Sequence, residues 1–255
     1  MTEPTVTAET ATPAGDVPWF EIPGWREEFG VVAGLTGRGD PASPFDLGLG
    51  GGAPIGVVLE RWRMVGRAFP GFDGIVVARQ VHGVRVLWHD RVTDLSIRDG
   101  ADGHATRAPG VMLAVSLADC VPVYLVDPVA GAVALLHSGW RGTAGRIVAA
   151  GISALRDHAG SRPADLVVHA GVGICGACYE VGADVAAACG QPATGSAAHL
   201  DLRRVIAAQA IAEGVRRVSV SSGCSAHDRT RFMSHRASGG RDGRMVALLG
   251  FPAPQ

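Results

Sequence analysis

A thiol and an imidazole lie at the same end of two short apolar runs that a tight turn separates. The runs span residues 121–126 and 132–137, with Asp, Pro and Gly between them. Apolar runs of this length, bounded by turn residues, are typical of buried strands, so the sequence predicts a β-hairpin. A turn over residues 127–130 places Cys120 directly opposite His137, with their Cβ atoms about 5 Å apart. A five-residue turn instead sends the two side chains to opposite faces.

The segment after the second run carries a second chemical feature. Residues 138–143 read Ser-Gly-Trp-Arg-Gly-Thr and lead into residues 144–156, where apolar side chains recur at the spacing of an amphipathic helix. Thr143 is the predicted N-cap of this helix. A glycine-containing turn with Arg141 and Arg146 near a helix start is typical of an anion-binding site. The alternative is an ordinary turn and cap whose arginines face solvent.

The composition limits the class of protein. Of the 255 residues, 47% are hydrophobic and 18% are charged, which supports a large core and excludes a globally disordered chain. The formal net charge of -1 argues against nucleic acid as the main partner. The sequence contains no lysine, which excludes a Schiff-base lysine and a phosphate-loop lysine.

The cysteines and the N-terminus indicate where the protein resides. There are five cysteines, an odd number without the spacing of a secreted disulfide framework. Cys175 and Cys178 form a Cys-x-x-Cys pair, but no second such pair is present, so we expect structural or loop roles for them rather than a zinc site. The first residues lack the basic and apolar regions of a signal peptide, and no apolar run is long enough to span a membrane. We therefore expect a cytoplasmic protein without a membrane partner.

The predicted elements mix strands and helices without strict alternation. Residues 1–17, rich in Thr, Ala and Pro, predict a disordered tail before a single domain over residues 18–255. We expect strands at residues 31–35, 75–78, 84–88, 166–170, 215–220 and 245–249, helices at 55–69, 184–189 and 202–213, and a polar loop at 100–106. This pattern favours an α+β fold, a single-domain mixed-sheet sandwich with flanking helices.

Four short motifs together resemble a known family. They are Gln80-Val81-His82-Gly83, Ala118-Asp119-Cys120-Val121-Pro122, His137-Ser138-Gly139-Trp140-Arg141-Gly142 and Cys178-Tyr179-Glu180-Val181-Gly182. In this order they resemble the laccase-domain family, whose members have been called multicopper polyphenol oxidases, purine nucleoside phosphorylases and peptidoglycan editing factors. The similarity runs from about Val31 to Leu249 and implies the laccase-domain fold for the ordered chain.

The resemblance implies a metal site and a substrate rim. It implies that His82, Cys120 and His137 bind one zinc ion and act as the catalytic residues. Two histidines and one cysteine with an open fourth position are typical of catalytic zinc. Copper is less expected, because the nine histidines include no His-x-His pair. The residues that the resemblance places at the substrate and phosphate rim are Arg38, Ser43, Asp119, Arg141, Tyr179 and Arg236.

The departures from the family pattern fall at the rim. The family's Thr-x-Arg-x-Gly-Gly-x-Ser is present as Thr36, Arg38 and Ser43, with Asp40-Pro41 in place of the glycines. Its Phe-x-Ser-Tyr-Arg-Arg reads Phe-Met-Ser-His-Arg-Ala, ending at Ala237. These changes bear on the choice of substrate and leave the three metal ligands intact.

The resemblance implies a zinc-dependent purine nucleoside phosphorylase, acting as a monomer or homodimer. Adenosine, inosine, guanosine or methylthioadenosine would react with phosphate to give the free base and a ribose 1-phosphate, with adenosine deaminase as a side activity. Two alternatives stay open. One is a cysteine or zinc amide hydrolase that edits peptidoglycan precursors, and the other is a non-enzymatic, zinc-stabilised binding module.

Overall fold

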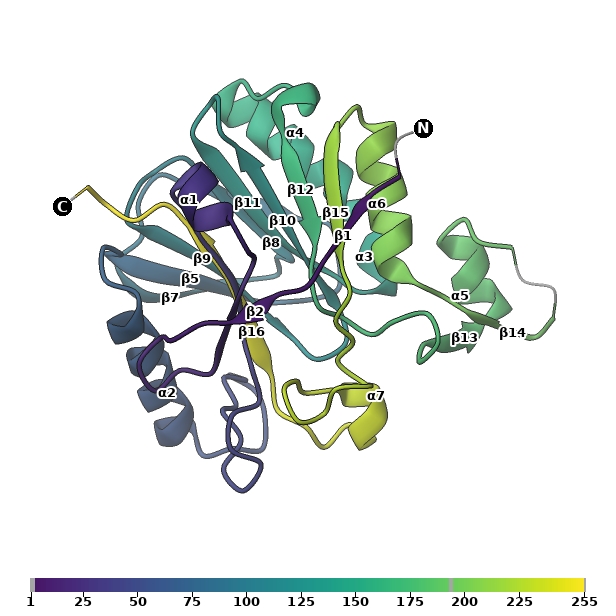
Figure 1. Ribbon diagram of the computed structural model, residues 1–255, viewed down its shortest axis with the longest axis horizontal. Helices are drawn as coiled ribbons and strands as arrows, with labels where there is room; N and C mark the ends of the chain where they lie inside the picture. Colours follow the sequence, from purple (N-terminus) through teal and green to yellow (C-terminus); the bar gives the residue numbers. More distant parts are fainter. Residues whose placement is uncertain (1–2, 193–194, 255) are drawn as a thin grey trace.

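The computed structural model describes residues 3–192 and 195–254, and within them the chain forms two seven-stranded mixed sheets packed face to face (Figure 1). The first sheet has the order β1 (Thr5–Thr7), β15 (Arg217–Ser221), β12 (Val167–Ala170), β10 (Val121–Asp127), β11 (Ala132–Ser138), β8 (Gly103–Thr106) and β6 (Val86–His89). The second has the order β2 (Thr10–Ala11), β3 (Trp19–Glu21), β4 (Val32–Thr36), β16 (Met245–Gly250), β9 (Val111–Leu117), β5 (Gly74–Arg79) and β7 (Asp94–Asp99). A separate ribbon pairs β13 (Glu180–Gly182) with β14 (Ala197–His199).

Helices cover the outer face of each sheet. The helices α4 (Ile147–Ala159) and α6 (Leu202–Ala212) pack on the first sheet, and α2 (Ile55–Ala68) packs on the second, on the opposite side of the molecule (Figure 1). The short helical segments are α1 (Trp25–Phe29), α3 (Trp140–Ala144), η1 (Pro163–Asp165), α5 (Ala183–Ala188) and α7 (His235–Ser238). The predicted mixed-sheet sandwich with flanking helices is confirmed. Over the described ranges, no helix combines the length and the hydrophobicity needed to cross a bilayer.

The central strands bury both faces, which explains why their sequences are continuously apolar. On β10, Val121, Val123 and Leu125 pack toward the α4 and α6 layer, whereas Tyr124 and Val126 pack between the two sheets. Side chains alternate along a strand, so odd and even positions supply different cores. The same alternation on β11 directs its odd-numbered positions between the sheets.

The predicted hairpin forms from β10 and β11, but in a different register. Asp127 pairs with Ala132, and Pro122 rather than Cys120 lies opposite His137. Each strand is displaced by one position relative to the prediction, so the parity of the pairing is unchanged. Cys120 and His137 therefore remain on one face as diagonal neighbours, although the predicted direct opposition is wrong.

The turn chemistry explains the register. The Asp127 carboxylate accepts hydrogen bonds from the backbone N–H groups of Val129 and Ala130, both at 2.9 Å. Such a side-chain bond is typical of an aspartate that precedes a turn. Gly131 closes the turn with a φ of 62°, which glycine adopts at little cost. Asp127 thus ends the strand, and the turn occupies residues 128–131.

The helix predicted at residues 144–156 begins three residues later, as α4, and the short helix α3 precedes it. Arg146 lies between α3 and α4 with a φ of 62°, an uncommon left-handed conformation for a residue with a side chain. Its guanidinium forms an ion pair of 2.7 Å with Glu213 at the surface. Thr143 is not the N-cap of α4. It lies inside α3, where its hydroxyl shares a hydrogen bond of 2.8 Å with that of Ser138.

The structure of the N-terminal segment also differs from the prediction. The sequence predicts a disordered tail over residues 1–17, whereas β1 pairs with β15 and β2 pairs with β3; residues 1–2 lie outside the described residues. Glu9 lies in the short segment that connects β1 to β2, and it is 6% exposed. Its carboxylate accepts hydrogen bonds from the backbone of Val172 at 3.0 Å, from His169 at 3.2 Å and from Ser221 at 2.6 Å. Local composition could not reveal this, because all three donors lie more than 150 residues away along the chain.

Replacing Glu9 with Ala should destabilise the protein by about 3 kcal/mol at neutral pH, because three buried donors lose their acceptor. Burial raises the pKa of Glu9, but the hydrogen bonds from His169 and Ser221 and the attraction of His169 lower it below 4.5 overall. The stability that Glu9 contributes is therefore present above pH 4.5 and is lost as the pH falls through the lowered folded value. Urea unfolding at several pH values measures this difference. Ala at the exposed Glu27 is the matched control, and an equal effect of both substitutions would contradict the tether.

Candidate active site

Three potential metal ligands come together where the hairpin strands end. His82 lies in the loop after β5, Cys120 lies in the loop between β9 and β10, and His137 lies on β11. One ligand atom from each residue lies within 4.8 Å of the others, and the two imidazole centroids are 4.9 Å apart. His137 is buried, Cys120 is partly buried and His82 is exposed. The group is therefore enclosed by the fold on one side and open to solvent on the His82 side.

One buried carboxylate orients two of these residues. Asp102 accepts a hydrogen bond of 2.9 Å from Nδ1 of His137. It also accepts the backbone N–H groups of Val81, His82 and Gly83 at 3.1, 2.9 and 2.7 Å. The sequence places Asp102 in a polar loop, whereas residues 103–106 form the buried strand β8. Asp102 was not predicted as a site residue, and no local motif identifies it, because its partners lie 20 and 35 positions away.

The charges of the site favour an ion pair between Cys120 and His137. Burial raises the pKa of the Cys120 thiol, but the charge of His137 and hydrogen bonds from His137 and His82 lower it to about 6. Burial lowers the pKa of His137, but the charge of Cys120 and the hydrogen bond to Asp102 raise it to about 9. Without a metal, the thiolate and the imidazolium therefore coexist at neutral pH. The thiolate is also the form of cysteine that binds metal.

The backbone around the site is closely packed. A Cβ atom at Gly139 would lie 3.0 Å from Sγ of Cys120 and 3.2 Å from Cδ2 of His82. Only glycine lets the chain pass this close to both ligands. His82 and Asp119 adopt positive φ angles of 58° and 87°, which are uncommon for residues with side chains. The fold thus holds these two residues in unfavourable conformations beside the candidate ligands.

Three of the predicted rim residues form a network next to Cys120. Asp119 accepts hydrogen bonds of 2.7 Å from the hydroxyl of Ser225 and from the backbone N–H of Arg236. The Arg236 guanidinium lies 5.1 Å from the ring centroid of Tyr179. Burial and, second to it, the negative charge of Cys120 raise the pKa of Tyr179. Asp119, Tyr179 and Arg236 are therefore brought together with the Cys–His group.

The other three predicted rim residues lie in different surroundings. Arg38 is buried, forms an ion pair with Asp242 and donates to the backbone carbonyl of Phe232 at 3.2 Å. Arg141 is exposed. Its guanidinium lies 4.3 Å from the ring centroid of the adjacent tryptophan. Ser43 is exposed on the loop after β4. In the part of the chain that the structure describes, no hydrogen bond or ion pair joins Ser43 or Arg141 to the three candidate ligands.

The structure shows a second group that the sequence prediction did not assemble. Cys175, Cys178, Cys224 and His227 place one ligand atom each within 4.8 Å of the others. The expectation of structural or loop roles for the Cys-x-x-Cys pair, rather than a zinc site, rested on the absence of a second pair of the same kind. The signal that could have found the group is a Cys-x-x-His pair, Cys224-Ser225-Ala226-His227. Each of the two groups could hold a metal ion.

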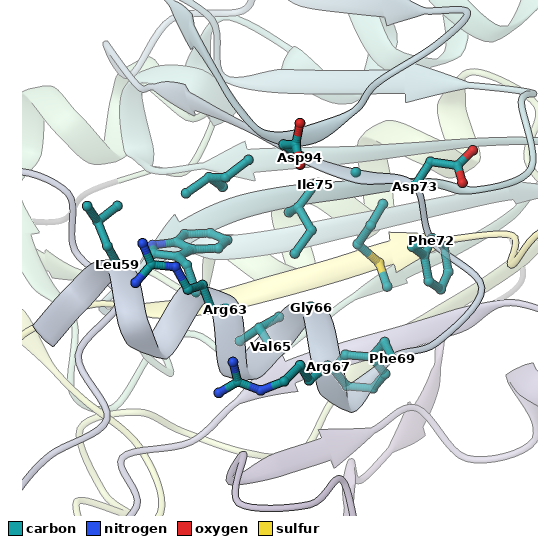
Figure 2. A pocket seen from close by; sticks show the side chains of 14 residues that line it. Leu59, Arg63, Val65, Gly66, Arg67, Phe69, Phe72, Asp73, Ile75 and Asp94 are labelled. Carbon is teal, nitrogen blue, oxygen red and sulfur yellow. The ribbon is translucent and has the colours of Figure 1, made fainter. Parts of the chain in front are cut away.

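A cavity of about 630 Å³ lies elsewhere, between α2 and the β5 strand (Figure 2). Apolar side chains such as Leu59, Phe69 and Ile75 line it, and Arg63 and Arg67 lie at its edge on α2. Its lining contains neither histidine nor cysteine, and none of the predicted site residues. The candidate chemistry therefore does not occur in this cavity.

The fold and the site define a two-sheet α+β protein with Cys–His groups able to hold a metal ion. The family described as multi-copper polyphenol oxidoreductase laccase matches this chain over residues 36–252. The match spans most of the chain, so the chain belongs to this family, as the four sequence motifs predict. The donor sets are compatible with zinc, whereas the description of the family refers to copper.

Known relatives share most of the chain. A protein of Deinococcus radiodurans named purine nucleoside phosphorylase is 36% identical over 206 residues, 78% of this chain and 79% of its own length. Adenosine deaminase RL5, from an unknown prokaryotic organism, is 37% identical over 193 residues, 68% of this chain and 73% of its own. The crystal structure of YlmD from Geobacillus stearothermophilus matches with a TM-score of 0.83 and 30% identity, over 96% of this chain and 99% of that one.

Iodoacetamide should alkylate Cys120 of the metal-free protein with half-maximal rate near pH 6, because His137 stabilises the thiolate. In a His137→Ala variant, we expect this midpoint to move upward toward the ordinary pKa of 9.0, since the stabilising charge is gone while burial remains. Peptide mass spectrometry as a function of pH follows each cysteine separately. Cys189 is the internal control, because burial raises the pKa of its thiol and it should react slowly. An unchanged midpoint for Cys120 in the variant would rule out the ion pair.

Proposed function

We propose that this protein is a zinc-dependent purine nucleoside phosphorylase whose active site is the group formed by His82, Cys120 and His137. The observation that carries the proposal is this group: two imidazoles and a thiolate gathered within 4.8 Å, closed by the fold on one side and open on the other. Relatives at 31–37% identity carry purine nucleoside phosphorylase names, and one is named an adenosine deaminase, which supports a purine nucleoside as substrate.

The donor set fits a catalytic zinc ion. Two imidazole nitrogens and one sulfur are ligands that zinc prefers, and three protein ligands leave one position for water or substrate. The hydrogen bond from Nδ1 of His137 to Asp102 directs the other nitrogen of the ring toward Cys120. Two imidazoles and one thiolate also occur in blue-copper centres, but phosphorolysis transfers no electrons, so the proposed reaction calls for the redox-inactive zinc ion. When bound, zinc would supply a Lewis acid that polarises an oxygen of the reacting molecules.

The reaction requires that phosphate be held beside the ribose. In phosphorolysis a phosphate oxygen bonds to C1′ of the ribose while the bond from C1′ to the purine nitrogen breaks. Arginine guanidinium groups bind phosphate with paired hydrogen bonds. Arg141 and Arg236 are the best candidates, because within the described ranges neither forms an ion pair with a carboxylate. Arg38 is already neutralised by Asp242, so we assign it to holding the segments on either side of α7, the short helix that carries Arg236.

The purine base would lie near Tyr179. The Tyr179 ring is half-buried beside Cys120, and one of its faces already contacts Arg236. A planar base stacked at this position would bring the ribose toward the three ligands and the phosphate toward the arginines. Asp119 would act by holding Ser225 and the backbone of Arg236 in place. Ser43 stays a prediction for the outer edge of the rim.

Adenosine deamination is a related candidate for the same site. The relative named adenosine deaminase RL5 supports it, since it is 37% identical over 193 residues. In deamination, water adds to C6 of the purine and ammonia leaves, so no phosphate is needed. Omitting phosphate from the assay therefore separates the two reactions.

A cysteine hydrolase that acts on an amide of a cell-wall precursor is the second class of function that the geometry favours. Asp102, His137 and Cys120 form a chain in which the carboxylate orients the imidazole and the imidazole stabilises the thiolate. This is the arrangement of a cysteine nucleophile, its base and an orienting acid. His82 has no place in such a triad, so it separates the two classes.

A His82→Ala variant should lose at least about 100-fold of the rate of adenine release from adenosine and phosphate, because the metal site loses a ligand. Chelation of the wild-type protein should abolish the same activity, and added zinc should restore it. The matched control is His158→Ala, which removes an exposed histidine that stacks on Trp88 outside the site. Chromatographic separation of adenosine, adenine and inosine gives all rates in one assay.

The same variant tests the hydrolase. If the protein is a cysteine hydrolase, His82→Ala and chelation leave amide cleavage of a cell-wall precursor intact, whereas Cys120→Ala abolishes it. A wild-type protein with full zinc and no turnover of any purine nucleoside would reject the phosphorylase.

A further inference from the structure

A second set of ligand-type side chains lies outside the three-residue group. Cys175 and Cys178 belong to the loop that follows β12, and Cys224 and His227 belong to the loop that follows β15. Sγ of Cys175 lies 3.5 Å from Nδ1 of His227, and Sγ of Cys178 lies 3.2 Å from Nε2 of the same ring. Two loops that are 49 residues apart in sequence thus present three thiols and one imidazole to a common point.

The distances suit a tetrahedral zinc ion. With bonds of about 2.3 Å to sulfur and about 2.0 Å to nitrogen, a sulfur and a nitrogen ligand of a tetrahedral ion lie about 3.5 Å apart. The observed distance from Sγ of Cys178 to Nε2 of His227, 3.2 Å, is within a few tenths of this value. Sγ of Cys175 lies 3.5 Å from Nδ1, the other nitrogen of the ring. A small rotation of the His227 ring would aim one nitrogen at the centre of the group. Four ligand atoms within 4.8 Å of one another leave room for an ion and little more.

The two ligand pairs, Cys175 with Cys178 and Cys224 with His227, each lie in a tight turn that brings residues three positions apart close together. The backbone N–H of Cys178 donates to the carbonyl of Cys175 at 3.0 Å, and that of Asp228 donates to Cys224 at 3.0 Å. The backbone N–H of Cys175 also points at Sγ of Cys224, at 3.3 Å. An N–H that donates to sulfur stabilises the thiolate form, which is the form that ligates. The geometry of both turns is therefore already that of a ligand site.

The two loops are also joined by their backbones. Gly173 and Cys224 form an isolated β-bridge, and the N–H of Ser225 donates to the carbonyl of Gly173 at 3.1 Å. These bonds hold the four side chains near one another before any ion binds. A site that needs little rearrangement loses little free energy on binding.

We propose that Cys175, Cys178, Cys224 and His227 bind a second zinc ion with a structural role. Three thiolates and one imidazole fill all four positions of a tetrahedral site, so no position is left for substrate. Soft thiolate ligands select zinc over magnesium, calcium or manganese. This site is independent of the activity of the three-residue group and does not rest on the proposed function.

The second zinc ion would stabilise the wall of the active site. Cys178 is followed directly by Tyr179, and Cys224 is followed by Ser225, whose hydroxyl donates to Asp119 at 2.7 Å. The same aspartate receives the backbone N–H of Arg236. Cross-linking the two loops through an ion thus fixes the residues that flank Cys120. Since the linked loops are far apart in sequence, the ion would also restrict the unfolded chain.

Metal analysis of the full-length protein, reconstituted with zinc and freed of excess metal, tests the proposal. We expect about two zinc ions per chain in the wild type and about one in Cys178→Ser, with Cys120→Ala also retaining about one. The double variant should retain none. Cys189→Ser is the matched control, because this buried cysteine lies outside both groups and should keep both ions.

A measurement on the wild type keeps the test valid if Cys178→Ser fails to fold. Cobalt-substituted wild-type protein should show the intense near-ultraviolet thiolate-to-cobalt absorption of a site with several thiolates, most of which survives in Cys120→Ala. About one zinc per chain in the wild type, lost entirely in Cys120→Ala, would overturn the second site. A disulfide between Cys175 and Cys178 in protein purified without air would overturn it as well. Two zinc ions without nucleoside turnover would reject the phosphorylase and leave this site standing.

Discussion

The hydrogen bonds of one buried carboxylate determine the geometry of the candidate active site. Asp102 accepts Nδ1 of His137 and the consecutive backbone N–H groups of Val81, His82 and Gly83. Burial raises its pKa, but these bonds hold the pKa below its ordinary value, so the group remains a carboxylate. A single side chain thus sets the orientation of one imidazole and the backbone position of the other. These bonds join the exposed loop that carries His82 to the residue that precedes β8.

The layered fold provides the rigid support for this carboxylate. Asp102 precedes β8, which pairs with β11 in the first sheet, and its backbone carbonyl accepts the N–H of His137 at 2.7 Å. The strands β10 and β11 are buried on both faces, so neither can shift without opening a core. Ligands placed at the ends of such strands keep their separation more closely than ligands on free loops. The open side of the site is formed by the loops that carry His82 and Tyr179 and by α7, which carries Arg236.

The two Cys–His groups share one region of the protein. Asp119 connects them, because its backbone carbonyl accepts the N–H of Ile174 at 2.9 Å and its side chain accepts Ser225 and Arg236. Its positive φ of 87° directs the chain from β9 toward Cys120. Cys120 of the first group follows Asp119 directly. In the second group, Cys175 follows Ile174 and Cys224 precedes Ser225, so both lie next to a residue that is hydrogen-bonded to Asp119. An ordered second group therefore favours an ordered first group, which is a physical reason for a protein of this size to keep four of its five cysteines in two clusters.

What the sequence by itself determined depends on short-range periodicity and turn chemistry. The apolar runs around Cys120 and His137 predict a hairpin with both side chains on one face. In the structure each strand is displaced by one position from the predicted register. The two side chains still share a face, because side chains alternate along a strand with a period of two. The sandwich with flanking helices and the helix α2 follow from the same periodicity. Only the tertiary structure decided that the N-terminal segment forms strands, that Asp102 orients the site, and that Cys175 lies next to Cys224. Each of these depends on hydrogen bonds or contacts between residues 20 to more than 200 positions apart, whose energies no local pattern records.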